Sequence, residues 1–291
     1  MYPSEFDYRV PSTLDEALTL LAEVGDDGRV LAGGQSLIPM MKLRLASPGV
    51  LIDINEIPGM NYINLSDGYL RIGALVRHND IVNSDVVTET NHTMAAAAPW
   101  IADPLVRNRG TVCGSISHCD PEGDWNSVML AVRAQVVARS GTGGERVIPI
   151  DDFIVDFFTN SLQPGEMVTE VRVPEYSGPA GGTYLKLERK IGDYATAAVA
   201  THLQLDPAGR ISQAGIAMTA VNSINTRASA AEDALVGQEP SAELFEEAGN
   251  LAADASDPED NVRGPAEYKR DLVRVYTRRG LAKALELAQA S

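Results

Sequence analysis

The sequence is poor in cysteine and in positive charge. Its 291 residues include only two cysteines, and 24 lysines and arginines stand against 40 aspartates and glutamates, a formal net charge of −16. Two cysteines cannot form a disulfide framework, and their scarcity is typical of a reducing compartment. The acidic balance disfavours nucleic acid and anionic membranes as main partners, because both repel a negative surface. Any anionic ligand must therefore be bound locally, by a few cations and backbone amides.

The chain also lacks a long hydrophobic run. Its start, MYPSEFDYRV, carries acidic residues and no apolar segment of a secretory signal. The most apolar later window, residues 94–106, is interrupted by Pro99, Asp103 and Pro104 and is too short to span a bilayer. We therefore expect a cytoplasmic protein without a transmembrane segment. The 44% hydrophobic content still predicts a sizeable buried core.

Two common nucleotide-binding signatures are absent as well. There is neither a GxGxxG fingerprint of the Rossmann type nor a GxxxxGK[ST] P-loop. Phosphate binding would have to use other glycine-rich segments.

The pattern of apolar residues predicts a small α/β unit at the N-terminus. Residues 13–24 form an amphipathic helix, with Leu14, Leu18 and Leu21 on one face. Strands are expected at residues 6–10, 29–32 and 50–54. Strand, helix, strand, loop and strand together predict a subdomain that closes near residue 55.

The rest of the chain divides into a mixed region and a region with strands first and helices second. Residues 69–174 mix short strands (69–75, 135–140, 146–150 and 168–174) with helical stretches at 86–98 and 125–133. PEYSGPAGG, residues 174–182, is rich in Pro and Gly and is interpreted as an interdomain linker. Beyond it come strands at 183–189, 195–205 and 211–221 and then helices, the last over 266–289. We therefore expect a first region over 1–177 (subdomains about 1–55 and 56–177) and an α+β domain over 178–291.

The segment LAGGQS, residues 31–36, is the first candidate binding element. Glycines after a strand let the backbone approach a phosphate closely, and successive N–H groups bind an anion without a cationic side chain. Ser36 adds a hydroxyl, and residues 37–44 predict a helix behind the loop. The alternative is a plain tight turn, and this segment alone does not decide between them.

The second candidate is RNRGTVCGSISHCDPEGD, residues 107–124. It repeats the combination of spaced glycines and hydroxyl side chains, namely Gly110 and Gly114 with Thr111, Ser115 and Ser117. We interpret the two segments as loops that hold the two phosphates of a dinucleotide from opposite sides.

Two other interpretations of the second segment are disfavoured. Cys113, His118, Cys119 and Asp120 suggest a metal site, but adjacent His118 and Cys119 cannot easily face one ion and no second cluster completes a shell. A catalytic triad of Ser117, His118 and Asp120 is disfavoured because triad members are not contiguous in sequence. We expect neither a metal ligand nor a catalytic side chain here.

The third candidate is YLKLERKIGDY, residues 184–194. Lys186 would place a cation near a developing anion, and Tyr194 would stack on a flat ring. The alternative is a surface lysine and a tyrosine at a strand end. Met40 and Met41 are interpreted as core residues.

Taken together, AGGQS, LIPMMKLR, LIDI, RNRGTVCGSISHCDP and KIGDYA resemble, in order and separation, the flavin-binding medium subunit of molybdenum hydroxylases. This family includes aerobic carbon monoxide dehydrogenase, with xanthine dehydrogenase as a relative that fuses the equivalent domain. The resemblance covers nearly the whole chain. It implies an α+β fold: a two-subdomain N-terminal α/β FAD-binding region of the PCMH type, then a C-terminal domain of a three-stranded sheet plus helices, with FAD between them.

The resemblance also implies cofactor-binding positions. Those that match the first pyrophosphate segment are Ala32, Gly33, Gly34, Gln35 and Ser36, and those that match the second are Thr111, Val112, Cys113, Gly114 and Ser115. Positions around the flavin are matched by Ile101, Asp124, Val168, Lys186 and Tyr194. One departure is Cys113, because the family commonly has two consecutive glycines in the second segment. Its side chain leaves open how closely the backbone approaches phosphate.

The function implied by the resemblance is electron transfer rather than substrate hydroxylation. A large subunit would hold the molybdenum cofactor, a small subunit would hold [2Fe–2S] clusters, and this subunit would pass electrons through FAD to an external acceptor, in a dimer of heterotrimers. Two cysteines agree with clusters on another chain, since a cluster commonly needs four. Lys186 would stabilise negative charge on the reduced flavin, and Tyr194 would cover one face of the ring.

Two alternatives remain at this point. A stand-alone flavin oxidoreductase of the vanillyl-alcohol-oxidase or cell-wall-precursor reductase type would carry its own acid and base groups, and no convincing set is found. A flavin-free scaffold protein would not need intact glycines in both segments. The substrate and the electron acceptor are not identified by this sequence.

Overall fold

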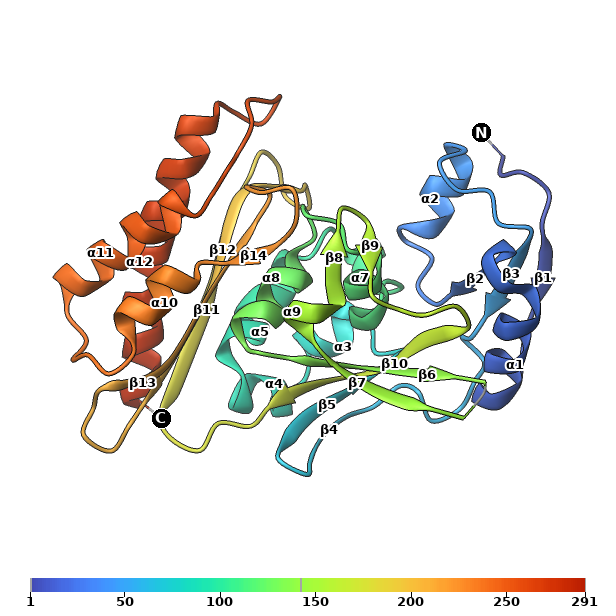
Figure 1. Cartoon of the computed structure of the whole chain (residues 1–291), viewed down its shortest axis with the longest axis horizontal. Coiled ribbons are helices and arrows are strands. Elements are labelled where there is room, and N and C mark those ends of the chain that lie inside the picture. The colour runs from blue at the N-terminus through green and yellow to red at the C-terminus, as the bar shows by residue number, and fades with distance from the viewer. Residues whose placement is uncertain (1, 142, 291) are drawn as a thin grey trace.

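Three sheets follow one another along the molecule, from the N-terminal unit to the C-terminal helices (Figure 1). The structure is a computed structural model that describes residues 2–141 and 143–290. Its sheets contain three, five and four strands, and a separate hairpin pairs β8 with β9. Helices separate the second sheet from the third, and more helices cover the outer face of the third sheet (Figure 1).

The N-terminal unit is a parallel three-stranded sheet with one helix packed on it. Its elements are β1 (Asp7–Arg9), α1 (Leu14–Val24), the 3-10 helix η1 (Gly25–Asp27), β2 (Gly28–Leu31), α2 (Leu37–Lys42) and β3 (Val50–Asp53). The last strand, β3, lies between β1 and β2. The hydroxyl of Thr13 accepts from the amide of Glu16 and caps α1, which buries Ala17, Leu18 and Leu21. The predicted elements of this unit are confirmed.

The central region is built on an antiparallel sheet of order β4-β5-β10-β6-β7. Its strands are β4 (Ile63–Ser66), β5 (Tyr69–Gly73), β6 (Gln135–Ser140), β7 (Glu145–Pro149) and β10 (Glu166–Pro174), with β8 (Ile154–Asp156) and β9 (Thr159–Asn160) apart. Its helices are α3 (His78–Val82), α4 (Asp85–Thr90), α5 (His92–Ala97), η2 (Ala98–Trp100), α6 (Pro104–Arg107), α7 (Val112–His118), α8 (Asp124–Ala131) and α9 (Ile150–Phe153). The middle strand, β10, comes last of the five in the sequence.

The C-terminal region pairs a second antiparallel sheet with three helices. Its elements are β11 (Ala180–Glu188), β12 (Ala195–Leu205), β13 (Ile211–Thr219), β14 (Thr226–Arg227), α10 (Ser229–Leu235), α11 (Ala242–Asp254) and α12 (Ala266–Ala290). One face contacts α12, and the other contacts α5 and α8 of the central region. Because both faces are covered, β12 is buried along nearly its whole length and shows no alternation of apolar and polar residues. The predicted α+β fold is confirmed, with the two-residue β14 added to the three predicted strands.

One predicted helix is in fact two. The stretch 86–98 was expected to be continuous, but α4 ends before Asn91 and α5 begins after it. The Asn91 side chain accepts from the amide of Met94 at 3.0 Å, so it caps a new helix. The continuous helix was a wrong prediction because Asn satisfies free helix-start amides better than it extends a helix.

The predicted linker is shorter than residues 174–182. Strand β10 runs to Pro174 and β11 starts at Ala180. Glycines 181 and 182 therefore belong to a strand rather than to a flexible connection. A Cβ at Gly181 would lie 2.0 Å from the carbonyl oxygen of Ala284, so this glycine lets helix α12 pack directly on the sheet.

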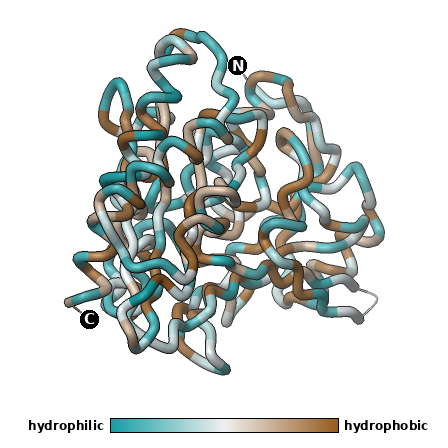
Figure 2. The backbone as a smooth tube through the Cα atoms, turned by 60° about the vertical axis from the view of Figure 1, so that its left-hand side comes forward, coloured by the Kyte–Doolittle hydropathy of each residue, from teal (hydrophilic) through white to brown (hydrophobic). Residues whose placement is uncertain are grey.

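Hydrophobic and hydrophilic residues alternate over short distances along the chain (Figure 2). Among residues 2–141 and 143–290, no helix is long and apolar enough to cross a membrane.

Candidate functional site

A cleft of about 900 Å³ lies where the three regions meet. Its walls come from the N-terminal unit, from the helices and the β8–β9 hairpin of the central region, and from the turn between β11 and β12. Most of the site residues predicted from the sequence line it: Ala32, Gly33, Gly34, Gln35, Ser36, Ile101, Thr111, Cys113, Gly114, Ser115, Asp124, Val168 and Tyr194. Val112 and Lys186 do not.

The two glycine segments touch each other at the cleft. A Cβ built on Gly33 would lie 2.5 Å from the carbonyl oxygen of Arg109 and 2.6 Å from the Cα of Gly110. Only a residue without a side chain allows backbone to approach backbone this closely. Segments that are far apart in the sequence therefore form one continuous wall.

A small polar network holds the two segments together from outside the contact. The Asn55 side-chain amide donates to the carbonyl of Ala32 at 2.8 Å. The Arg77 guanidinium donates to the Asn55 side-chain oxygen and to the carbonyl of Arg109, both at 2.5 Å. Arg77 thus ties the first segment to the second, because its planar fork presents several donors at once.

The first segment leaves donors unused. Among the described residues, the amides of Gly34, Gln35 and Ser36 donate to no other backbone or side-chain group. Ser36 precedes α2, but its hydroxyl makes no capping hydrogen bond. Gly34 has φ +72, which a side chain would strain. These groups are available to an anionic ligand.

The second segment was predicted to be a loop, but in the structure it is the start of a helix. Thr111 precedes α7, and its hydroxyl accepts from the amide of Gly114 at 3.1 Å. Val112, Cys113 and Ile116 are buried on one face of α7, a helical spacing. The prediction of a loop rested on glycine and small polar residues, which here occupy the cap and the exposed face of a helix.

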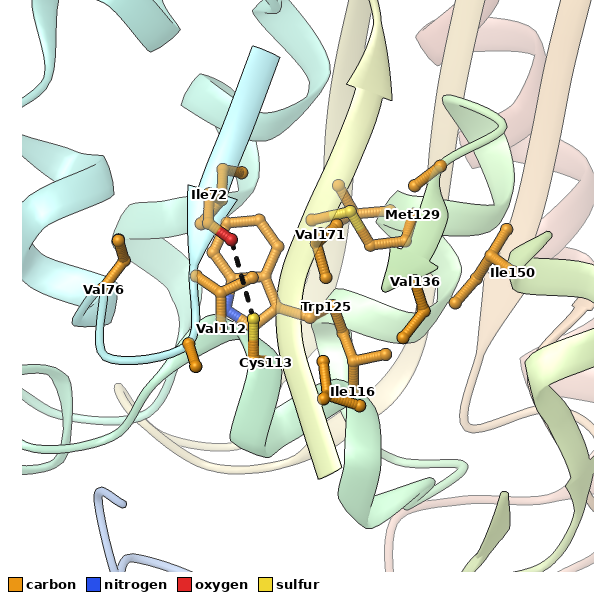
Figure 3. Packing of buried hydrophobic residues seen from close by; sticks show 14 of the residues in the cluster. Ile72, Val76, Val112, Cys113, Ile116, Trp125, Met129, Val136, Ile150 and Val171 are labelled. Carbon is orange, nitrogen blue, oxygen red and sulfur yellow. Dashed lines mark hydrogen bonds between the residues drawn. The ribbon is translucent and has the colours of Figure 1, made fainter. Parts of the chain in front are cut away.

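Cys113 points away from the cleft and into the hydrophobic core. Its thiol lies 3.8 Å from the carbonyl oxygen of Ile72, among Val112, Ile116 and Val171 (Figure 3). Burial raises the pKa of this thiol to about 12. The sequence left open whether the Cys113 side chain keeps the backbone away from a phosphate, and in the structure its thiol packs in the core. Val112 is fully buried and does not line the cleft.

Lys186 lies in a buried polar cluster beside the cleft. Its ammonium is 2.9 Å from Asp124, 3.1 Å from the carbonyl of Trp100 and 3.6 Å from Glu188. The Tyr184 hydroxyl donates to the other oxygen of Asp124 at 2.5 Å. Burial raises the pKa of Asp124, and the nearby Lys186 opposes this shift. Because two carboxylates already pair with Lys186, its positive charge is balanced within the protein.

Tyr194 closes one side of the cleft and is 47% exposed. It follows the turn after β11, and the Arg263 guanidinium lies 5.6 Å from its ring centre. Burial and the neighbouring Asp120 carboxylate raise the pKa of its hydroxyl. Ile101 and Val168, each 7% exposed, supply apolar lining elsewhere in the cleft.

The methionine pair was predicted to be core, and the structure supports this only for Met41. Both methionines belong to α2. Met41 is buried, whereas Met40 is partly exposed and lines the cleft. The two neighbours point to different sides because successive helical residues are about 100° apart.

Three residues at the site were missed from the sequence: Asn55, Arg77 and His78. Asn55 lies two residues after the end of β3, a position where polar side chains often mark a site, and that signal was available. Arg77 and His78 carry no such signal. Their importance depends on contacts with residues 109 and 110, more than thirty positions away.

Neither cysteine is paired, and both thiols are buried. In the described ranges, no three His, Cys, Asp or Glu side chains come together in a way that could hold a metal ion.

Two family models match the chain in succession. Residues 4–176 match a family described as the FAD binding domain in molybdopterin dehydrogenase, and residues 182–284 match the CO dehydrogenase flavoprotein C-terminal domain. The chain is 38% identical to the 6-hydroxypseudooxynicotine dehydrogenase complex subunit alpha of Paenarthrobacter nicotinovorans, over 99% of this chain and 97% of that protein. It is 37% identical to the carbon monoxide dehydrogenase medium chain of Hydrogenophaga pseudoflava, over 98% of each.

Solved structures show the same fold over the whole length. A chain of carbon monoxide dehydrogenase from Hydrogenophaga pseudoflava superposes with a TM-score of 0.93 at 39% identity, over 98% of this chain and 99% of that chain. A chain of quinoline 2-oxidoreductase from Pseudomonas putida 86 has a TM-score of 0.90 at 30% identity, over 99% of each.

Proposed function

The chain belongs to the FAD-binding subunits of molybdenum hydroxylases, and from this membership we propose that it carries electrons from [2Fe–2S] clusters on a partner subunit, through FAD, to an external acceptor. The family models cover both the FAD-binding part and the C-terminal part. Neither a stand-alone flavin oxidase nor a flavin-free scaffold would be expected to match both. When bound, FAD supplies the reversible uptake and release of electrons.

The observation that carries the proposal is the contact between the two glycine segments in the wall of the cleft. Backbone donors of the first segment are free, and the hydroxyl side chain of Ser36 has no partner in its own helix. The cleft volume of about 900 Å³ lies within the usual range of about 300–1,000 Å³ for cofactor sites. The residues present therefore fit a ligand with two phosphates and a flat ring.

Each predicted site residue receives a role in this proposal. Residues 32–36 and 111–115 hold the pyrophosphate with backbone amides and hydroxyls. Cys113 contributes backbone alone, and Val112, whose amide donates to the carbonyl of Val76, packs behind the segment. Ile101 and Val168 give the ring an apolar surface, and Tyr194 covers its open side. Asp124 lines the cleft, and Lys186 orients Asp124 instead of touching the flavin.

The assembly and the domain division are part of the same proposal. A large subunit with the molybdenum cofactor and a small iron–sulfur subunit would complete a heterotrimer, two of which would associate, in the cytoplasm. The names of the relatives, "medium chain" and "complex subunit", support a multi-subunit enzyme. We propose a division of the chain at residues 177/178, with the first part again split near residue 55. The family models end and resume at 176 and 182, which supports the first boundary.

The test is native purification of the complex, followed by mass spectrometry, metal analysis and a visible spectrum. We expect two further subunits, molybdenum, iron and one FAD for each copy of this chain. A colourless chain without partners would overturn the proposal, and a lone flavin-bearing oxidase would favour the stand-alone alternative. As a matched control for the two-phosphate site, complex stripped of flavin should regain FAD more tightly than FMN, which lacks the second phosphate and the adenosine.

A further inference from the structure

His78 is a buried side chain that the proposed function does not use. It begins α3, lines the cleft and is only 4% exposed. Its backbone amide donates to the carbonyl of Gly110 at 3.0 Å, which fixes α3 against the start of the second glycine segment. The imidazole therefore sits below the point where the two segments meet.

One neighbour determines which nitrogen of the ring carries the proton. The indole N–H of the fully buried Trp125 donates to Nδ1 of His78 at 3.0 Å. An indole nitrogen can only donate, so Nδ1 must accept, and a neutral imidazole must then carry its proton on Nε2. Burial, with Arg107 and Arg77 nearby, lowers the pKa of His78 to about 3, so the ring is neutral at physiological pH.

The Nε2–H group of His78 has no acceptor in the described part of the protein, and His78 lines the cleft. Within the described part of the chain, no oxygen or nitrogen accepts from it. A donor that faces a cleft and has no protein acceptor is free to bind a ligand there. The partner is therefore to be sought in what fills the cleft.

The position of Nε2 indicates which part of a ligand it meets. A Cβ at Gly110 would lie 2.6 Å from Nε2, and a Cβ at Gly33 would lie 2.6 Å from the Cα of Gly110. The nitrogen, Gly110 and Gly33 are thus close neighbours, and glycine at position 110 keeps the space beside the nitrogen clear. Residues 31–36 of the first segment include no lysine or arginine. The negative charge of a phosphate would therefore be stabilised here by fixed hydrogen-bond donors.

We propose that His78 binds the pyrophosphate of FAD through Nε2–H, as a neutral donor whose orientation is set by Trp125. This inference rests on the proposed function, since it requires FAD in the cleft. It adds a side-chain contact to a site otherwise made of backbone amides and hydroxyls. A neutral donor holds the anion without placing a further positive charge beside the flavin.

Two substitutions separate this role from simple support of Trp125. In His78→Gln the side-chain nitrogen occupies nearly the place of Nε2, whereas in His78→Asn it occupies nearly the place of Nδ1. If the Nε2 donor binds FAD, His78→Asn raises the dissociation constant of FAD about 10- to 100-fold, the usual loss for a hydrogen bond to a charged group, and His78→Gln raises it less than about fivefold. Each is measured on the purified complex, stripped of flavin and titrated with FAD by fluorescence.

His202 provides the matched control. It is also buried, at 2% exposure, and stacks on Tyr176 with ring centres 4.1 Å apart, away from the cleft. His202→Asn should lower the melting temperature and leave the FAD dissociation constant unchanged. The opposite order for His78, with Asn normal and Gln weak, would overturn the inference, as would normal binding in both variants. Failure of the wild-type complex to take up FAD would instead overturn the proposed function.

A second measurement is made on the wild-type chain and does not depend on the folding of a variant. The chain has four histidines, so nitrogen-15 labelling of histidine in the full chain resolves each tautomer by NMR. We expect His78, assigned by its absence from the His78→Gln spectrum or by its contact to the indole proton of Trp125, to be neutral and protonated on Nε2. Protonation on Nδ1 would overturn the inference without any affinity measurement.

Discussion

Glycines serve different ends in the cleft and in the C-terminal sheet. At the cleft, Gly33 and Gly110 allow two backbone segments and an imidazole to meet beside an open cavity. In the C-terminal sheet, a Cβ on Gly215 would lie 1.9 Å from the carbonyl of Ala131, and one on Gly181 would lie 2.0 Å from that of Ala284. These glycines let helices α8 and α12 lie directly on strands.

This difference distinguishes glycines that shape the candidate binding site from glycines that allow the fold to pack. A side chain added at the cleft can move a segment toward the cavity, where there is room. A side chain added under a helix has buried backbone on both sides and no room, because interiors are close-packed. We therefore expect substitutions of the first kind to reduce FAD binding and substitutions of the second kind to reduce stability.

The largest effect is expected for Gly215→Ala. The added methyl group would collide with the backbone of α8 and push the C-terminal sheet away from the central region, at a cost of roughly 3 kcal/mol, the upper end for overpacking. Thermal and denaturant unfolding measure this loss. Gly144→Ala is the matched control, because nothing lies within 4 Å of a Cβ there and its φ is ordinary. Equal stability of the two variants would contradict the close-packing argument.

A smaller but more selective effect is expected for Gly33→Ala. The methyl group would separate the two glycine segments, so FAD affinity should fall about 10-fold or more while the unfolding free energy falls by about 1 kcal/mol. FAD titration of the flavin-stripped complex and thermal unfolding are measured on the same sample. If stability falls as far as in Gly215→Ala with FAD binding unchanged, the comparison between the two regions is wrong.

Each region also holds one neutral buried histidine, and both respond to acid in the same direction. Burial lowers the pKa of His78 and of His202 to about 3, below the ordinary value of 6.5. The unfolded chain therefore binds more protons between these values, so stability is kept above about pH 6.5 and lost as pH falls toward 3. Each histidine contributes up to about 1.4 kcal/mol per pH unit.

Single substitutions measure that slope region by region. His202→Gln should flatten the fall in unfolding free energy between pH 6 and pH 4. The slope should decrease by about 1.4 kcal/mol per pH unit, the value for one proton. Because His78 lies at the cleft and His202 does not, bound FAD should flatten the acid loss only through His78, since a nearby phosphate charge favours the protonated ring. An unchanged slope in His202→Gln would mean that this imidazole is not buried in its neutral form.

The smallest effect on FAD binding is expected for Cys113→Gly, which restores the two consecutive glycines common in the family. The thiol packs in the core, so FAD affinity should stay within about twofold. Stability should fall by about 1 kcal/mol, from lost packing and from a glycine inside α7. FAD titration with denaturant unfolding checks both, and markedly tighter binding would show that Cys113 restricts access to the phosphates.

Local elements could be predicted well where a pattern is repeated along the chain. The helix after LAGGQS, the amphipathic α1 and the three long C-terminal strands follow from apolar spacing and caps. The helix break at Asn91 and the helical character of Val112–His118 were missed, since one cap residue outweighed composition in each case.

The candidate site could be predicted in its residues but not in its arrangement. Both glycine segments were found from their residue types, yet nothing local indicates that Gly33 contacts Gly110 or that His78 lies beneath them. A direct flavin role for Lys186 was expected from its charge and from the family resemblance. Its pairing with Asp124 and Glu188 comes from strands and helices that meet only in the folded chain.

The sequence by itself determined the family, the cofactor class and the two candidate segments, because glycines, hydroxyl side chains and their order are properties of the chain. Only the tertiary structure decided which side chains face the cleft. Cys113 turns into the core, Met40 turns out of it, and Trp125 selects the proton position of His78. The reason is physical: side-chain direction and tautomer depend on close packing and hydrogen bonds between residues far apart in sequence, and no local pattern encodes those contacts.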